Sequence, residues 1–271
     1  MGFFKKLFEK KECSICGGEI GLLGNRKLED GNMCKVCAGK LSPWFSDRRN
    51  STVDQINEQL AYREENQKKL ENFQVAYSVG EYYKLFVEEE NGVPVRFFVS
   101  SYDDYMEENP DILSFQDVIS CVTDVESHRT ELKQRNSEGE MVSYNPPKFE
   151  YSYDFTVDMA IRNNPYFNDI SFKLNSSSVD IVVQERSSRL SGILLGDKGL
   201  EPTYDPDYRK YQKMCKQIDQ IFADSRQAVA AAAKEIVEEA APEPERPTVC
   251  PGCGAPAGTG KFCEYCGTAL G

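Results

Sequence analysis

The sequence contains very little histidine and tryptophan. His128 is its one histidine and Trp44 its one tryptophan among 271 residues. A single imidazole excludes histidine-rich metal sites and leaves little basis for imidazole-dependent catalysis. No apolar run approaches the roughly 20 residues that a membrane-spanning helix needs, and no signal peptide precedes the first charged residues. These absences predict a soluble, cytoplasmic protein without a transmembrane segment.

Basic side chains are also scarce, and they are unevenly placed. The chain has 32 Lys and Arg against 44 Asp and Glu, a net charge of −12. This excess excludes a protein that coats nucleic acid or an anionic membrane with its whole surface. Residues 1–50 nevertheless carry ten basic and six acidic side chains, a balance of +4, whereas residues 51–247 carry −16. The acidity therefore belongs to the middle of the chain.

Cysteine is abundant but absent from most of the chain. Eight of the ten cysteines form four CxxC pairs close to the two ends. A secreted disulfide framework would spread its bridges over the whole fold, whereas paired CxxC motifs are typical of metal ligands in a reducing compartment. The other two, Cys121 and Cys215, fall on apolar stripes and are expected to be small core residues.

The first two CxxC pairs predict a zinc site made by Cys13, Cys16, Cys34 and Cys37. Two residues between cysteines let both thiolates face one point, and Gly17 suits the left-handed position that such a turn often needs. Four thiolates complete a closed tetrahedral shell. The expected order of a knuckle, a hairpin and a short helix is that of a treble clef. The alternative is two thioredoxin-like redox pairs, although a redox CxxC needs no matching second pair.

Residues 13–45 resemble the hallmark of a bacterial domain-of-unknown-function family that carries an N-terminal four-cysteine module. The resemblance lies in the stretch CSICGGEIGLLGNRKLEDGNMCKVCAGKLSPWF, and later segments also look like the longer proteins that bear this module. It implies zinc binding and a bacterial cytoplasmic origin, but no enzymatic activity and no ligand. Its distinctive positions are Gly24, Lys27-Leu28, Asp30-Gly31 and Lys40-Leu41-Ser42-Pro43-Trp44-Phe45.

The last two CxxC pairs predict a second zinc site made by Cys250, Cys253, Cys263 and Cys266. Both halves are CxxCG knuckles, and the segment resembles the small zinc-ribbon modules appended to many bacterial proteins. A segment of this size has almost no apolar core, so metal binding must supply its folding energy. Iron is the competing metal, because ligand type alone does not separate the two. Each module is shorter and poorer in aromatic packing than an iron-sulfur electron carrier needs, so we expect two Zn²⁺ per chain.

The sequence as a whole predicts an α+β protein. A central antiparallel β domain lies between a treble-clef-like zinc module and a zinc ribbon. The predicted parts are an amphipathic N-terminal segment (1–12), the four-cysteine module (13–50), a connecting helix (51–74), the β domain closed by a helix (75–224), an Ala/Glu/Pro-rich tether (225–248) and the ribbon (249–271).

Turn and periodicity signals outline the central domain. Asn91-Gly92 predicts a hairpin, Pro146-Pro147 a break in the chain, and the alternation from Tyr151 to Met159 a half-buried strand. A final helix begins near Pro206, with an apolar face of Tyr208, Tyr211, Cys215, Ile218 and Phe222. Strands followed by one such helix are the order of a pleckstrin-homology-like barrel; the alternative is an open antiparallel sheet with the helix packed across it.

The connecting helix has a capping box but an interrupted apolar stripe. Ser51 or Thr52 is the expected cap, with Asp54 and Gln55 in register. Polar residues, Arg63 and Gln67, occupy the stripe that the apolar residues begin. The helix is therefore expected to dock on a domain or to pair weakly.

The first eleven residues, MGFFKKLFEKK, combine four apolar side chains with four lysines. Such a segment suits peripheral contact with an anionic membrane through residues 3–11. Docking on the first zinc module and disorder are the alternatives that we favour.

The function that these features support is a non-enzymatic adaptor with a protein partner whose identity the sequence leaves open. No motif identifies a catalytic or cofactor-binding residue, and His128 is expected to be a surface or structural histidine. The alternative is a nucleic-acid-binding protein that acts through the basic N-terminal zinc module. An enzyme that uses a cavity of the central domain ranks last.

Overall fold

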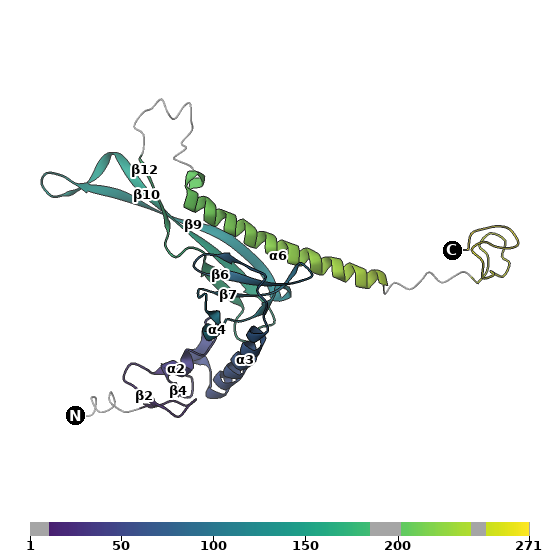
Figure 1. Cartoon of the computed structure of the whole chain (residues 1–271), viewed down its shortest axis with the longest axis horizontal. Coiled ribbons are helices and arrows are strands. Elements are labelled where there is room, and N and C mark those ends of the chain that lie inside the picture. The colour runs from purple at the N-terminus through teal and green to yellow at the C-terminus, as the bar shows by residue number, and fades with distance from the viewer. Residues whose placement is uncertain (1–10, 185–201, 240–247, 271) are drawn as a thin grey trace. The chain divides into compact units, whose positions relative to one another are not determined.

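A computed structural model describes residues 11–184, 202–239 and 248–270 (Figure 1). The chain divides into two compact units, Met1–Arg226 and Gln227–Gly271, and each is described by itself. The predicted amphipathic segment lies outside the described residues except for its last two, Lys11 and Glu12. No helix in the described ranges is long and apolar enough to span a membrane.

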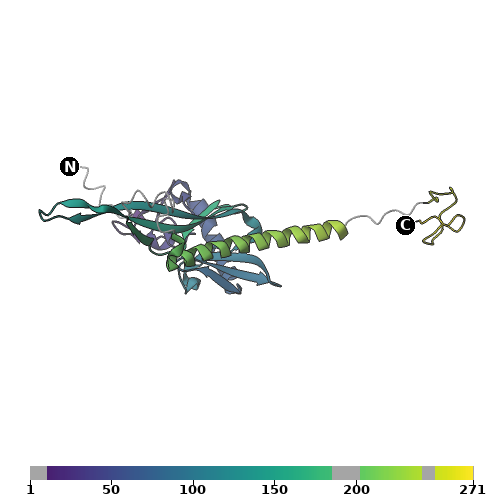
Figure 2. The ribbon, with the colours of Figure 1, turned by 90° about the horizontal axis from the view of Figure 1, so that it is seen from above.

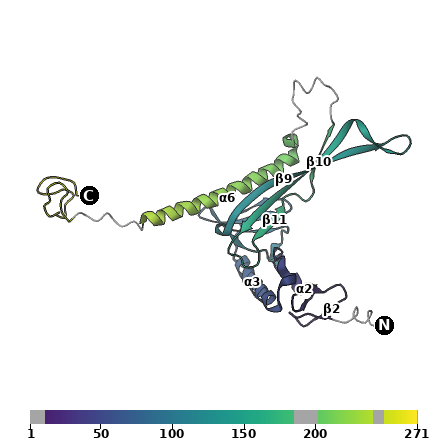
Figure 3. The ribbon, with the colours of Figure 1, turned by 180° about the vertical axis from the view of Figure 1, so that it is seen from behind.

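The four-cysteine module at the start of the first unit is built from very short elements. Two minimal hairpins precede a single turn of α-helix, and one buried side chain of the following helix, Ile56, completes the small core. In Figure 3, β2 (Glu19–Ile20), α2 (Lys35–Ala38) and the helix that follows the module, α3 (Val53–Glu71), lie in this part of the unit. The elements are β1 (Lys11–Glu12), β2 (Glu19–Ile20), β3 (Arg26–Lys27), β4 (Asn32–Met33), α2 (Lys35–Ala38) and the 3-10 helix η1 (Asp47–Asn50).

The connecting helix, α3 (Val53–Glu71), begins with the predicted capping box. The Gln55 backbone N–H donates to Thr52 Oγ1 at 3.3 Å, and the Thr52 N–H donates to Gln55 Oε1 at 2.9 Å. These two bonds satisfy backbone donors that a helix N-terminus leaves without partners. Thr52, not Ser51, is therefore the cap.

The polar residues that interrupt the apolar stripe of α3 include an arginine buried in a hydrogen-bonded network. Arg63 is only 4% exposed, and its Nη1 lies 2.9 Å from Asp111 Oδ1. The same guanidinium donates through Nε to the Lys40 carbonyl oxygen at 3.1 Å, and Ser42 Oγ donates to Asp111 Oδ2 at 2.7 Å. A buried charge needs such partners to be tolerated. The network ties the four-cysteine module to the segment just before the last strand of the first sheet.

The first sheet is four-stranded and antiparallel, in the order β5-β6-β7-β8. The predicted Asn91-Gly92 hairpin joins β6 to β7, and both residues have positive φ, 53° and 78°, as a type I′ turn requires. A short helix, α4, and the 3-10 helix η2 flank β8. The bounds are β5 (Tyr77–Gly80), β6 (Lys84–Glu90), β7 (Val93–Ser100), α4 (Tyr105–Glu108), β8 (Leu113–Ser114) and η2 (Phe115–Asp117).

Gly80 permits a tight turn between β5 and β6 that sequence reasoning missed. Its φ is +131°, and a Cβ at this position would lie 2.1 Å from the Tyr83 carbonyl oxygen. We expect Gly80→Ala to lower the free energy of unfolding by about 2 kcal/mol, because the new methyl group forces this sparsely populated backbone to move.

Urea denaturation of Gly92→Ala provides the matched control for that prediction. Gly92 also has positive φ, +78°, but a Cβ there would meet nothing within 4 Å. Only the backbone penalty of about 1 kcal/mol then applies. Equal losses in the two variants would show that the close contact at Gly80 is unimportant.

The second sheet is organised around one long strand, β10. Strand β9 pairs along one edge of β10. On the other edge, β12 pairs with residues 148–153 of β10 and β11 with residues 156–160. Beyond the pairing with β12, β9 and β10 continue as a two-stranded ribbon (Figure 2). The strands are β9 (Val118–Arg135), β10 (Met141–Ile161), β11 (Asp169–Lys173) and β12 (Val179–Gln184).

The predicted chain break at Pro146-Pro147 is wrong. Strand β10 continues through both prolines, with a cis peptide bond between Asn145 and Pro146. Its pairing with β9 shifts register between Ser143 and Lys148. The missing proline N–H groups are accommodated at this irregularity, so the strand bulges where the sequence predicts that it stops.

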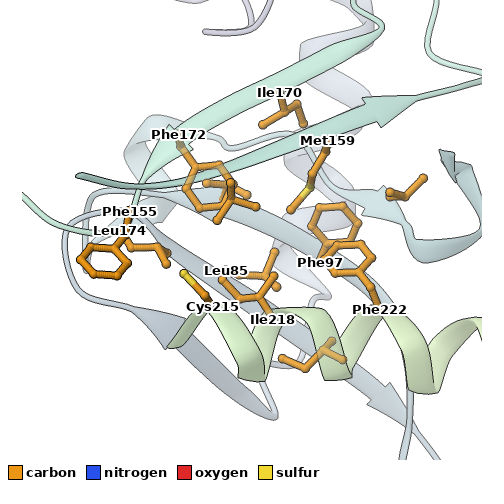
Figure 4. Packing of buried hydrophobic residues seen from close by; sticks show 14 of the residues in the cluster. Leu85, Phe97, Phe155, Met159, Ile170, Phe172, Leu174, Cys215, Ile218 and Phe222 are labelled. Carbon is orange, nitrogen blue, oxygen red and sulfur yellow. The ribbon is translucent and has the colours of Figure 1, made fainter. Parts of the chain in front are cut away.

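The main core lies between strands of both sheets and the last helix, α6 (Pro206–Glu239), which follows the 3-10 helix η3 (Pro202–Tyr204). In Figure 4, Cys215, Ile218 and Phe222 of α6 face Leu85 and Phe97 of the first sheet. The predicted apolar face of this helix is confirmed, because all five of its residues are buried: Tyr208, Tyr211, Cys215, Ile218 and Phe222.

The architecture is thus mixed helix and sheet, with antiparallel sheets and a cysteine cluster towards each end. The predicted pleckstrin-homology-like barrel is not confirmed, because the described strands of the central domain form two separate four-stranded sheets and neither is closed. Each sheet contributes one face to the core that α6 completes.

The second unit contains the rest of α6 and the C-terminal cysteine segment. The described part of the predicted tether is helical as far as Glu239. Beyond residue 247, two isolated antiparallel bridges, Val249 with Pro256 and Phe262 with Ala269, close the two halves of the segment. Its small core contains Cys250, Cys263 and Leu270.

Candidate metal centres

The structure brings the eight predicted ligands together in two groups of four. Within each group all four Sγ atoms lie within 4.8 Å of one another. The first group is Cys13, Cys16, Cys34 and Cys37, and the second is Cys250, Cys253, Cys263 and Cys266. Cysteines that are 21 residues apart in the chain, such as Cys13 and Cys34, thereby become neighbours.

The backbone of the first group is folded around the sulfur atoms. The Cys34 N–H donates to Cys13 Sγ at 3.3 Å, and the Cys37 N–H donates to Cys34 Sγ at 3.3 Å. Cys34 is the N-cap of α2, so its sulfur takes the place that a serine or aspartate oxygen usually fills. Amide hydrogen bonds of this kind orient ligands and stabilise negative charge on sulfur.

Three of the four CxxC turns end in a glycine with positive φ. Gly17, Gly254 and Gly267 have φ of 70°, 71° and 78°. This confirms the prediction that the residue after the second cysteine adopts a left-handed conformation. The remaining turn, Cys34–Cys37, continues into α2 instead and is followed by Ala38, because a helical residue needs negative φ.

The second group has the same type of support. The Gly252 N–H donates to Cys250 Sγ at 3.3 Å. The Thr268 hydroxyl lies 3.1 Å from Cys266 Sγ. Thr268 is a supporting residue that sequence reasoning missed, and its place two positions after a CxxC cysteine is the only signal that the sequence offers.

The thiols of the first group differ sharply in their tendency to ionise. Burial raises the pKa of Cys13, but hydrogen bonds from the backbone of Cys16, Cys34 and Ile15 outweigh it and lower the pKa to about 6. Burial, followed by contacts with the other three cysteines, raises the pKa of Cys37. Four thiolates in contact repel one another, so they cannot all ionise unless a cation lies between them.

The second group shows the same division. The hydroxyl and backbone of Thr268 lower the pKa of Cys266 to about 6. The backbone of Ala255 lowers the pKa of Cys253, but the Cys266 thiol, burial and the other cysteines raise it to about 12. Each group thus pairs an easily ionised thiol with one that ionises only when a cation offsets the charge of its neighbours.

The sulfur separations also fit a tetrahedral metal ion. They are 3.9 Å for Cys16–Cys34, 3.5 Å for Cys250–Cys266 and 3.7 Å for Cys253–Cys263. Zinc–sulfur bonds of about 2.3 Å in a regular tetrahedron place sulfur atoms about 3.8 Å apart. A disulfide would need a separation of about 2 Å. The residues therefore fit a metal ion in both groups.

The other residues singled out from the sequence belong to neither group. Cys215 is buried in the main core and Cys121 packs against it, as predicted. Burial raises the pKa of Cys121 to about 12 and that of Cys215 to about 11. His128 is exposed on β9, opposite Ser152 of β10.

Comparison with known proteins identifies only the N-terminal module. A family model described as a domain of unknown function (DUF4428) matches residues 11–59. The match covers the first cysteine group and the first turns of α3. No curated protein and no solved structure matches the chain significantly.

Proposed function

We propose that the protein is a non-enzymatic, zinc-stabilised interaction protein. Two structural zinc sites of four cysteines each, one treble-clef-like and one ribbon-like, flank an acidic central domain that contacts a protein partner. The residues that would hold zinc are the two groups of four cysteines, and the metal would supply the cross-link that each small module lacks.

The spacing of the sulfur atoms carries this proposal. Separations of 3.5–3.9 Å, with backbone N–H groups directed at sulfur, suit four thiolates around one ion. A closed shell of four protein ligands leaves no open position for substrate, and this favours a structural over a catalytic role. The core of the second module has only three buried residues, so its folding depends on the metal.

Elemental analysis of the purified chain tests the metal content. We expect two zinc ions per chain and a colourless protein, whereas tetrahedral four-sulfur sites that hold iron are red. A preparation with no bound metal, or one in which iron occupies both sites, would contradict the proposal.

Removal of the metal provides a further prediction. A strong chelator should unfold both modules but leave the far-ultraviolet circular dichroism of the sheets and α6 largely intact. The reason is that the main core contains none of the eight ligands. Heat denaturation in chelator should therefore retain one cooperative transition, and loss of all secondary structure on chelation would show that the modules support the whole fold.

A further inference from the structure

Two leucines occupy the tip of a tight turn in the four-cysteine module. The Gly24 N–H donates to the Gly21 carbonyl oxygen at 2.8 Å, so Leu22 and Leu23 are the central residues of a β-turn. Their side chains are 76% and 86% exposed. Such positions normally hold glycine, asparagine, aspartate or proline, because turn tips face water. Two adjacent leucines here create an apolar tip without a partner among the described residues.

A cluster of arginines adjoins this turn. Arg26 Nη1 donates to the Leu23 carbonyl oxygen at 3.5 Å, and Arg48 Nη1 donates to the Lys27 carbonyl oxygen at 2.7 Å. Burial, and then the positive charges of Arg26 and Arg49, lower the pKa of Arg48, as expected for a guanidinium group beside two other cations. In the part of the chain that the structure describes, none of the three forms a salt bridge.

The chain enters the module beside the same turn. Lys11 of β1 is paired with Ile20 of β2, and the turn begins at the next residue, Gly21. Residues 1–10 precede β1 in the sequence and contain three phenylalanines, one leucine and three lysines. An apolar and basic sequence therefore leads directly into the edge of the module where Leu22 and Leu23 lie.

We propose that this edge of the module binds the surface of an anionic lipid bilayer, with Leu22 and Leu23 inserted among the lipids and the cluster of Arg26, Arg48 and Arg49 against the phosphate groups. Apolar side chains beside uncompensated cations are the two signals that stable peripheral binding needs. Nucleic acid would complement the charge but leaves the leucines exposed. A protein groove would cover the leucines, but it does not account for the arginines.

The charge distribution orients the protein on such a surface. Residues 1–50 carry +4, whereas residues 51–247 carry −16. An anionic bilayer attracts the first and repels the second, so binding places the module at the lipid and keeps the acidic part of the chain away from it. This inference goes beyond the zinc proposal, because it concerns residues that ligate no metal.

Co-sedimentation of the full-length, metal-loaded chain with vesicles tests the proposal. We expect binding to vesicles of equal parts phosphatidylcholine and phosphatidylglycerol, and none to phosphatidylcholine alone. Leu22→Ser/Leu23→Ser should weaken binding at least about tenfold, because it removes the apolar area that enters the lipid. Ile119→Ser/Val122→Ser is the matched control, since these β9 side chains are 61% and 56% exposed and lie outside the module. It should bind like the unaltered chain.

Charge reversal supplies a second variant that does not depend on the leucines. Arg49→Glu should weaken binding about fivefold or more, because each cation near an anionic surface contributes that much. Lys216→Glu, at an exposed position of α6, should have no such effect. Zinc content, measured on every variant, separates this test from the proposed function.

Three results would overturn the proposal. The first is a chain that holds two zinc ions yet fails to sediment with the mixed vesicles. The second is a Leu22→Ser/Leu23→Ser variant that binds as tightly as the unaltered chain, which would assign binding to another segment. The third is a chain that retards duplex DNA but binds no vesicles, which would assign the arginines to nucleic acid.

Discussion

Replacing Cys34 by serine is expected to reduce bound zinc from two ions per chain to one and to unfold the N-terminal module. Cys34 belongs to the first group of four cysteines, so the substitution removes one expected metal bond. Serine is itself a good N-cap, so the start of α2 keeps its cap and the loss is that of the metal. Among the described residues, the core of the module contains seven buried hydrophobic residues, and two of them, Cys13 and Cys37, are expected ligands. Apparent binding energies of about 10–16 kcal/mol are typical of structural zinc in such modules, so loss of the ion exceeds any stability that this core supplies.

The fluorescence of Trp44 shows whether the N-terminal module is the part that unfolds. The Trp44 indole packs against the main core, and the backbone N–H of this residue donates to Ser42 Oγ at 3.2 Å, near the end of the four-cysteine module. We expect a red shift of its fluorescence in Cys34→Ser. Cys263→Ser is the matched variant: it should also lose one zinc ion, but without the shift, because its cluster belongs to the second unit.

Cys121→Ser controls for the loss of a thiol as such. Cys121 lies on β9, outside both groups, and this variant should retain two zinc ions. The assignment of Cys34 as a ligand would be wrong if Cys34→Ser retained both ions, or if its Trp44 emission matched that of Cys263→Ser.

Asp111→Ala is expected to lower the free energy of unfolding by about 3–5 kcal/mol, the cost of leaving one member of a buried ion pair without its partner. The Asp111 side chain is fully buried, and that of Arg63 is 5% exposed. The substitution leaves the guanidinium charge in the protein interior and removes the acceptor of the Ser42 hydroxyl. Urea denaturation, followed by circular dichroism, measures the loss.

Two further variants sharpen this test. Lys68→Ala removes an ion pair with Glu65 whose two side chains are 67% and 65% exposed, and it should leave the urea midpoint almost unchanged, because water screens such a pair. Arg63→Met/Asp111→Leu replaces the buried pair by apolar groups and should recover much of the lost stability. If Asp111→Ala were as mild as Lys68→Ala, the network would not hold the module to the sheet.

Features that depend on local chemistry could be predicted well from the sequence. The CxxC spacing predicts which sulfur atoms converge, and the glycine after the second cysteine predicts the left-handed residue. The capping box before α3 and the Asn91-Gly92 turn likewise depend on residues that lie within a few positions of one another in the sequence. The apolar face of α6 follows from helical spacing alone.

Features that depend on distant partners could not be predicted. Arg63 interrupts the stripe of α3, and its burial is explained by distant partners, among them the Lys40 carbonyl oxygen and Asp111, 48 residues later. Considered alone, the prolines at 146 and 147 predict the end of a strand. In the structure β10 continues through them, because it pairs with β9 on both sides of the two prolines and with β12 from Lys148 onward. The closure of a sheet is likewise a property of all its strands together, which is why two open sheets stand where the sequence predicts a barrel.

The sequence by itself determined which cysteines converge in two groups of four, and the contrast between a basic start and an acidic middle, because CxxC geometry and charge are properties of neighbouring residues. Only the tertiary structure decided which polar side chains are buried and which apolar ones remain exposed. Leucine is a residue type that usually lies in a core, yet the turn that holds Leu22 and Leu23 exposes both to solvent. Arg63 looks like a surface residue, yet its partners lie in segments that only folding brings together.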